Sequence, residues 1–362
     1  MTLMPGTFID GKPAQTLTLK NQNGMSISVM DMGATWLSCL VPLKKVPLTK
    51  EPISNKSDEV ELREILLATN HMEDHLKQTA YMGATIGRVA NRIAKGRFTL
   101  DNVEYQLPIN NGENCLHGGI DGFSHRRWQV EKATESKVLF SLMSADGDQG
   151  FPGELMVTVE YELTEANEVV ICYGAKTNKA TPVNLTNHAY FNLMGANEGV
   201  NCLNHKLQIN SDYYLQIFDD LIPTGQRLPV DNTGFDFRQL KIIEQDFLKG
   251  KDQQIASGYD HAFITNHGND AFAAKLVSPD NKVTLQMQTS QPALHVYTGN
   301  FLKGNPARRQ KSDNQTEYQN YAGIALEPEY FPDSPNNEQF PNSILQPDEN
   351  YLEKTVYAFS FF

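Results

Sequence analysis

The segment TPVNLTNHAYFNL, residues 181–193, places one histidine among side chains that form hydrogen bonds. Asparagines and threonines flank His188, whereas Val183, Leu185 and Phe191 are typical of a buried strand. An imidazole with its ordinary pKa of ~6.5 gives and takes protons near neutral pH. Neighbouring amides and hydroxyls can fix the orientation of its ring without giving it a permanent charge. His188 is therefore a candidate general acid or base.

Four other segments carry side chains that could act with this histidine. Their imidazole, carboxyl, amide and guanidinium groups suit a neutral, polyhydroxylated ligand, because hydroxyl groups need donors and acceptors at fixed positions. Proton transfer on such a ligand needs an acid and a base, which histidine and glutamate supply. The segments are GRVANRIAKGRF with Asn91 and Arg92, NNGENCLHGG with His117, GYDHAF with Asp260, and ALEPEYFPDSPN with Glu327.

The motifs of several other enzyme classes are missing from the sequence. It contains no P-loop, no dinucleotide-binding glycine fingerprint after a strand, no G-x-S-x-G and no H-E-x-x-H. His71 and His75 in HMEDH would share one face of a helix, as two metal ligands do, but no third ligand lies near them in the sequence. We therefore predict a solvated helical face at 71–75, and a site without metal or cofactor.

Charge and apolar content limit the partners of the chain. The net charge of −12, from 31 Lys and Arg against 43 Asp and Glu, disfavours nucleic acid and anionic membrane surfaces. No run approaches the ~18 apolar residues of a membrane span, and the N-terminus lacks the pattern of a secretory signal. The four cysteines are widely spaced among apolar residues, which favours buried free thiols. These features predict a cytoplasmic protein whose partner is a small molecule.

Alternating apolar and polar residues predict the elements that position these groups. QTLTLKN and MSISVMD flank QNG, which predicts a hairpin. The best helical pattern, KIIEQDFL at 241–248, is short. The charged, proline-containing segment 42–64 predicts an exposed loop. Many strands joined by short polar turns favour an all-β fold, a large antiparallel sandwich, and we expect residues 1–362 to form one domain. Further predicted strands cover 137–144, 154–164, 168–177, 205–209, 282–290, 293–299 and 355–362.

Five segments together resemble the aldose 1-epimerase family, also called galactose mutarotases. They are GATIGRVANRIAKGRFTLDNVEYQLPINNGENCLHGG, TPVNLTNHAYFNL, GYDHAF, YTGNFL and ALEPEYFPDSPN, in the family's order across nearly the whole chain. The resemblance implies a large galactose mutarotase-like β-sandwich with few short helices and with the sugar site on a concave sheet face. It also implies an isomerase without cofactor, which interconverts the α and β anomers of free aldohexoses such as galactose and glucose.

The resemblance implies a role for each site residue. Glu327 would be the general base that takes the proton from the C1 hydroxyl, and His188 would be the general acid that protonates the ring oxygen. His117 would contact the hydroxyl being deprotonated or its neighbours. The residues that would bind sugar hydroxyls are Arg92, Asp260 and, as a weaker candidate, Asn91.

Two features depart from the family pattern. His295, in PALHVYTGNFL, stands where a sugar-binding glutamine is expected, so we include it in the candidate site and leave the preferred sugar open. The charged segment 42–64 is longer than the family pattern predicts. The polar residues without a matching role, which we expect to be structural or exposed, are His125, His205, His261, His267 and Asp333.

Two alternatives remain open at this point. An epimerase of a phosphorylated hexose would need further basic side chains at the site, which Arg126 and Arg127 in SHRRW would supply. A non-catalytic carbohydrate-binding sandwich is also compatible with the fold, because a fold does not fix a function. The combination of Glu327, His188 and His117 favours the enzyme. We expect a monomer or homodimer that binds a free aldohexose.

Overall fold

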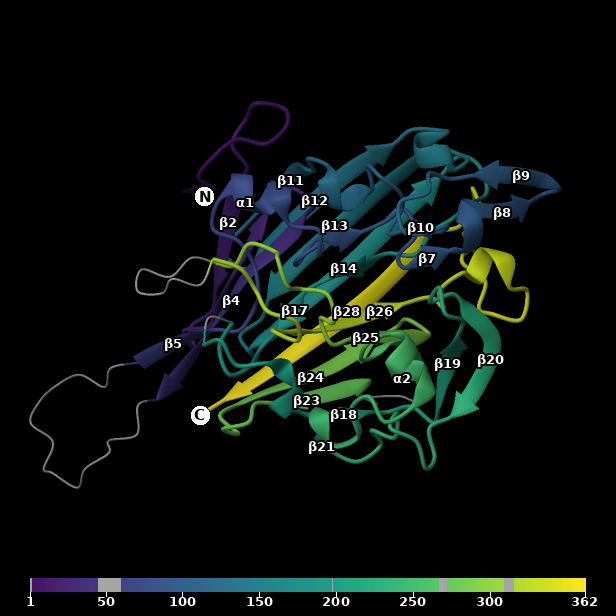
Figure 1. The fold of residues 1–362 in the computed structure, drawn as a ribbon. Helices are drawn as coiled ribbons and strands as arrows, with labels where there is room; N and C mark the ends of the chain where they lie inside the picture. Colours follow the sequence, from purple (N-terminus) through teal and green to yellow (C-terminus); the bar gives the residue numbers. More distant parts are fainter. Residues whose placement is uncertain (1, 45–59, 197, 267–271, 309–315) are drawn as a thin grey trace, which may run out of the picture.

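The computed structural model describes residues 2–44, 60–196, 198–266, 272–308 and 316–362. Strands dominate this part of the chain, as the alternation of apolar and polar residues predicts (Figure 1). Its two α-helices are short: α1 covers Met72–Lys77 and α2 covers Lys251–Ile255. Neither helix has the length or the apolar run that a membrane-crossing helix needs.

The largest sheet has nine antiparallel strands, and its long central strands run side by side in Figure 1. The predicted strands at 137–144 and 168–177 are confirmed with the same bounds, because their alternating residues face the core and the solvent in turn. In spatial order the strands are β11 (Gln129–Ala133), β12 (Lys137–Ser144), β13 (Leu155–Leu163), β14 (Glu168–Thr177), β28 (Tyr351–Phe361), β24 (Val283–Thr289), β23 (Ala274–Val277), β18 (Lys206–Ile209) and β21 (Lys241–Ile242).

A six-stranded antiparallel sheet carries most of the candidate site. On β25, Leu294 and Val296 belong to the main apolar core, so the alternation along the strand turns His295 and Tyr297 to the opposite face. In spatial order its strands are β17 (Tyr190–Phe191), β26 (Ile324–Glu329), β25 (Ala293–Tyr297), β22 (Asp260–Ile264), β19 (Tyr213–Ile217) and β20 (Pro223–Pro229).

The N-terminal strands form a third sheet in chain order, and short strand pairs complete the fold. The predicted hairpin at QNG is confirmed by the pairing of β2 with β3. The sheet contains β1 (Thr2–Leu3), β2 (Gln15–Lys20), β3 (Ser26–Met30), β4 (Thr35–Lys44) and β5 (Val60–Glu64). The pairs are β6 (Thr85–Ile86) with β16 (Thr186–Asn187), β7 (Arg92–Ile93) with β10 (Cys115–Leu116), β8 (Arg97–Leu100) with β9 (Val103–Gln106), and β15 (Thr181–Pro182) with β27 (Ile344–Leu345).

The three large sheets share one apolar core. Ile27 on β3, Val159 on β13 and Leu326 on β26 belong to the same buried cluster. Trp36 of β4 packs its indole edge-on against the ring of Tyr357 of β28, with the ring centroids 5.4 Å apart. The six-stranded sheet therefore has this core on one face, and the opposite face is available for polar side chains.

Three sequence predictions need correction. Residues 42–44 and 60–64 are not loop, because they pair as the strands β4 and β5; residues 45–59 lie outside the described part. The pattern at 241–248 forms the two-residue strand β21 and a 3₁₀ turn at Ile243–Asp246, since pairing of Lys206 with Ile242 extends the large sheet there. Cys172 is only partly buried, because it lies on the solvent-facing side of β14; the other three cysteines are buried and all four are free.

Candidate active site

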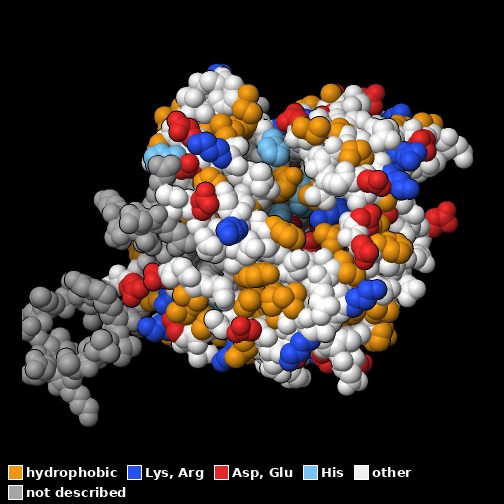
Figure 2. Space-filling view, in the orientation of Figure 1, with side chains coloured by type: hydrophobic (Ala, Val, Ile, Leu, Met, Phe, Trp, Pro, Cys, Tyr) orange, Lys and Arg blue, Asp and Glu red, His pale blue; other side chains and the backbone are white. Residues whose placement is uncertain are grey.

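All seven sequence-predicted site residues line one pocket of about 280 Å³. Figure 2 shows a hollow on this face of the molecule, in which histidine and basic side chains are visible among hydrophobic ones. The residues that line the pocket come from β22, β25 and β26 and from loops and short strands, most of them in the first half of the chain. The lining residues are Thr79, Ala80, Tyr81, Asn91, Arg92, Asn111, Leu116, His117, His188, Tyr190, Leu221, Asp260, His295, Tyr297, Phe301, Leu302 and Glu327.

Glu327 is a buried carboxyl group on the polar face of β26. Its neighbour Leu326 points into the core, and its register partner across β25 is His295. The side chain is 2% exposed, and its Oε2 has no hydrogen-bond partner in the described structure. Burial raises the pKa of Glu327 well above its usual value, and the nearby carboxyl group of Glu329 adds to the shift. When ionised, Glu327 is therefore a strong base whose Oε2 accepts no hydrogen bond from the described residues.

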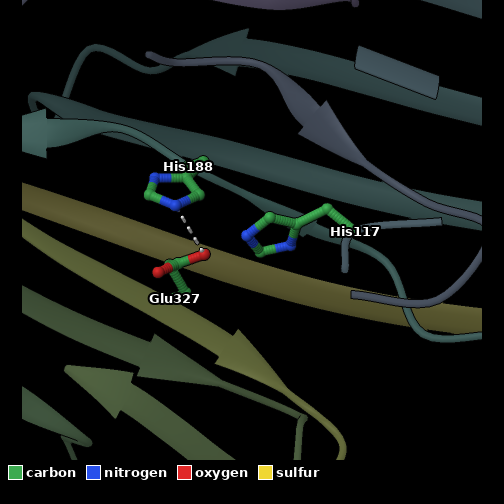
Figure 3. A group of neighbouring side chains, drawn as sticks. All are labelled: His117, His188 and Glu327. Carbon is green, nitrogen blue, oxygen red and sulfur yellow. Dashed lines mark ion pairs between the residues drawn. The ribbon is translucent and has the colours of Figure 1, made fainter. Parts of the chain in front are cut away.

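His188 lies between β16 and β17 and faces Glu327. Backbone hydrogen bonds hold it: its N–H donates to Ala84 and its carbonyl accepts from Gly83, both at 2.9 Å. Its Nε2 is 3.6 Å from Glu327 Oε2, as the dashed line in Figure 3 shows. Burial lowers the pKa of His188 to about 4, so our expectation of an ordinary imidazole pKa is wrong. The free imidazole is neutral at physiological pH.

His117 approaches the same carboxyl group from a loop. Its backbone has a positive φ of 52°, and the chain continues through Gly118, where a Cβ atom would lie 2.0 Å from the carbonyl oxygen of Gly87. The backbone N–H of Asn91 donates to His117 Nδ1 at 3.2 Å, which places the ring proton on Nε2. Figure 3 shows that this second nitrogen turns toward Glu327. His117 thus presents a hydrogen-bond donor to the pocket.

His117, His188 and Glu327 each have a possible metal-ligand atom within 4.8 Å of the others. A metal ion needs a free lone pair on each imidazole, yet the bond from Asn91 leaves His117 with a proton on the nitrogen that faces the pocket. The donor set therefore fits proton transfer better than metal binding. His71 and His75 belong to no group of metal-ligand spacing among the described residues, and His75 is buried in α1 rather than solvated.

Asp260, His295 and Arg92 form a second polar part of the pocket wall. His295 Nε2 lies 2.6 Å from Asp260 Oδ1, and an Arg92 guanidinium nitrogen lies 3.9 Å from Asp260 Oδ2. Burial alone would raise the pKa of Asp260, but the hydrogen bond to His295 and the charge of Arg92 hold it well below its usual value. Asp260 is therefore a carboxylate, and His295 Nε2 is its hydrogen-bond donor.

The two arginines considered for phosphate binding are engaged elsewhere. Arg126 pairs with Asp148 at 2.6 Å, and Arg127 pairs with Asp31 at 2.5 Å. Neither lines the pocket, whose one basic side chain among the described lining residues is Arg92. The geometry therefore gives no support to a phosphate site made by these residues.

The residues expected to be structural have structural contacts where they are described. Asp333 accepts a hydrogen bond from the backbone of Ala94 at 3.0 Å and from the side chains of two asparagines in its own loop. The ring of His205 accepts from the backbone N–H of Leu193 at 2.9 Å. His261 stacks edge-on against Phe235 in the core, with ring centroids 4.7 Å apart. His125 is exposed, and His267 lies outside the described residues.

Glu329 and the aromatic lining of the pocket were not predicted from the sequence. Glu329 is fully buried two positions after Glu327, so both face the same side of β26; the alternation of a strand would have indicated this. Burial raises the pKa of Glu329 to about 7. The rings of Tyr81 and Tyr190 pack on His188, with ring centroids 6.1 and 4.8 Å away. Phe301, 62% exposed, is at the pocket mouth. Tyr190 and Phe301 lie in segments that resemble the family, but no role was predicted for these rings.

Comparison with known proteins gives the family. The family model described as aldose 1-epimerase matches residues 15–358. The chain belongs to the aldose 1-epimerase family. Its sequence is 44% identical over 359 residues to the aldose 1-epimerase of Escherichia coli strain K12, covering 98% of each chain. It is 40% identical to the galactose mutarotase of Mus musculus, over 82% of this chain and 84% of that one.

Solved structures of aldose epimerases have the same fold as this member of the family. A homologue from C. elegans superposes with a TM-score of 0.84 at 28% identity, covering 96% of this chain and 99% of that one. Galactose 1-epimerase from Lactobacillus acidophilus superposes with a TM-score of 0.81 at 28% identity, covering 99% and 98%. The expected fold class, a large galactose mutarotase-like antiparallel β-sandwich, is therefore confirmed.

Proposed function

We propose that this chain is a mutarotase that interconverts the α and β anomers of free aldohexoses such as galactose and glucose. The observation that carries the proposal is the facing pair of Glu327 and His188, 3.6 Å apart at the base of a polar pocket. A pocket of about 280 Å³ is just below the ~300–1,000 Å³ range of small-molecule sites, which suits a ligand as small as a monosaccharide.

Ring opening needs two proton transfers on the same sugar. In our proposal, Glu327 removes the proton of the C1 hydroxyl while His188 delivers a proton to the ring oxygen. The C1–O5 bond then breaks and the C1 carbonyl forms, so the sugar becomes an open-chain aldehyde. Rotation about C1–C2 exposes the other face of the aldehyde, and reclosure reverses both transfers. No atom or electron leaves the sugar in the whole cycle.

A single proton shared by Glu327 and His188 is sufficient for this cycle. Before ring opening it resides on His188, and after ring opening the sugar's proton resides on Glu327. Burial favours the neutral pair in the empty site, since it raises the pKa of Glu327 and lowers that of His188. A bound C1 hydroxyl donates to Glu327 and favours its ionised form, which moves the proton toward His188. Substrate binding thereby moves the pair toward the state that ring opening requires.

The remaining wall residues suit the recognition of hydroxyl groups. Asp260 is a carboxylate that accepts hydrogen bonds, and Arg92 and the Nε2–H of His117 are donors. His117 is close enough to Glu327 to stabilise the alkoxide that forms at O1 in the transition state. His295 holds Asp260 in place where glutamine was expected. The Nε2–H of an imidazole can donate to a carboxylate as the amide of a glutamine can, which supports a binding role for this position.

Three broader features belong to the same proposal. We propose one domain over 1–362, since the nine-stranded sheet joins strands from Gln129 to Phe361 and the family match spans 15–358. The four free cysteines support a reducing, cytoplasmic setting. We propose a free sugar rather than a nucleic acid or membrane partner, and we leave monomer and homodimer as alternatives.

Polarimetry of freshly dissolved α-D-galactose tests the function. Purified protein should speed the approach of optical rotation to equilibrium, and treatment with EDTA should leave the rate unchanged. The same assay with D-galactose 6-phosphate should show a lower kcat/KM, because the described pocket lining holds no Lys and no second Arg to pair with the phosphate charge. Faster turnover of the phosphorylated sugar would favour the alternative epimerase. Binding of galactose without any acceleration would favour a carbohydrate-binding protein.

A further inference from the structure

Asn91 lines the pocket, but its polar atoms are already used within the protein. Its side-chain nitrogen lies 3.1 Å from Glu329 Oε1 and 3.3 Å from His295 Nδ1, which accounts for both amide protons. Its side-chain oxygen accepts the backbone N–H of Arg92 at 2.9 Å. Asn91 therefore has no side-chain donor left for a sugar, contrary to the role that the sequence suggests.

The bonds of Asn91 decide where two imidazole protons lie. Its backbone N–H donates to His117 Nδ1 and its side-chain amide donates to His295 Nδ1. Each ring then carries its proton on Nε2, which in His117 faces Glu327 and in His295 faces Asp260. Both protons are needed there. The proton of His117 is donated into the pocket, and the proton of His295 is donated to the carboxylate of Asp260.

Glu329 holds the amide of Asn91 in this orientation. Its Oε1 is an acceptor, so the nitrogen of the amide rather than its oxygen must face it. It is fully buried on β26, its Oε1 lies 3.6 Å from His295 Nδ1, and it does not line the pocket. A flipped amide would place its oxygen against Glu329 Oε1 and His295 Nδ1, which are both acceptors in this arrangement. Glu329 therefore fixes the orientation of the Asn91 amide, which no residue of the pocket lining would fix.

We propose that Asn91 and Glu329 are positioning residues, which hold His295 and, through the backbone of Asn91, His117 as Nε2–H tautomers. This inference rests on the proposed function, because it concerns how the residues of that active site are held in place. The two residues touch no reacting atom in the proposed mechanism. Their effect on the sugar passes through His117, His295 and Asp260.

Three variants separate positioning from a structural role. Asn91→Gly removes the amide but keeps the backbone N–H and the φ of 62°, which glycine adopts readily. Glu329→Leu keeps the buried volume without an acceptor. Glu329→Gln is the matched control, because its oxygen can still accept from Asn91.

Long-range ¹H–¹⁵N NMR of histidine-labelled full-length protein reads the tautomers directly. We expect Nε2–H for both rings in the wild type and in Glu329→Gln. In Asn91→Gly and Glu329→Leu, His295 should become a tautomer mixture, while His117 stays Nε2–H in Asn91→Gly. By calorimetry the same two variants should bind D-galactose more weakly, and kcat/KM should fall by about 10- to 100-fold, as for a misplaced catalytic group.

Two results would overturn the inference. One is a wild-type His295 protonated on Nδ1, alone or together with Nε2. The other is an unchanged tautomer and galactose affinity in Asn91→Gly, which decides the case even if Glu329→Leu fails to fold. The tautomers are measured without turnover. A protein that lacks mutarotase activity but shows the expected tautomers would therefore refute the proposed function and not this inference.

Discussion

Replacing Glu327 with glutamine should lower the activity of the protein without lowering the stability of its fold. Glutamine keeps the shape of the side chain but cannot accept the proton of the C1 hydroxyl. General acid–base catalysis by a positioned group contributes ~10²–10⁴-fold, and kcat should fall by that factor with a much smaller change in KM. The carboxyl group is 2% exposed and its Oε2 accepts no hydrogen bond from the described residues, so no stabilising hydrogen bond of that oxygen is lost.

The stability change follows from the pKa of Glu327. Burial raises this pKa in the folded state above its value in the unfolded chain, so the folded state loses stability as pH rises and the group ionises. Glutamine never ionises, and the variant should therefore be at least as stable as the wild type at pH 8. Polarimetry with α-D-galactose measures kcat, and urea unfolding followed by circular dichroism measures stability. A variant that unfolds more easily while each folded molecule keeps its kcat would refute the reasoning.

Three further predictions follow from other parts of the structure. Arg92→Ala and Asp260→Ala should each lower kcat/KM roughly 10- to 100-fold, since a hydrogen bond to a charged group contributes ~1.5–3 kcal/mol; an unchanged kcat/KM in a folded variant would remove that residue from the site. Glu329 has a pKa of about 7 against 4.5 in a free side chain, so its ionisation lowers the stability of the fold as pH rises. Between pH 5 and 8, Glu329→Gln should gain up to about 3 kcal/mol over the wild type in urea unfolding, and parallel pH curves would contradict this. Replacing 45–59 with an Asn-Gly turn should leave kcat/KM unchanged, because Lys44 and Val60 already pair across β4 and β5; a fall in polarimetric rate would show that the segment contributes to the site.

Local patterns predicted the long strands well and the short ones poorly. The alternation of apolar and polar residues predicted the bounds of the strands at 137–144 and 168–177, because each strand has one face in the core and one toward solvent. The two-residue strands, such as Thr186–Asn187 beside His188, are too short for any period and depend on partners far away in the sequence. The 241–248 segment has a helical pattern, yet its first residues extend a sheet, since tertiary pairing overrides local preference.

The candidate site could be predicted as a set of residues but not as a network. The family resemblance gave roles to six residues, and these six line the pocket together with His295, which departs from the family pattern. The low pKa of His188 depends on burial by Tyr81 and Tyr190, which no spacing in the sequence indicates. The bonds of Asn91 to Glu329 and His295 likewise depend on three separate segments that meet only in the folded chain.

The claim that Glu327 and His188 act as one acid–base unit is tested most directly by a double-mutant cycle. Polarimetry with α-D-galactose should compare the wild type, Glu327→Gln, His188→Asn and the double variant, all confirmed as folded by circular dichroism. Residues that act as a unit are not additive, so the double variant should be little slower than the slower single variant. If the two losses multiply, Glu327 and His188 contribute independently, and the shared-proton mechanism is contradicted.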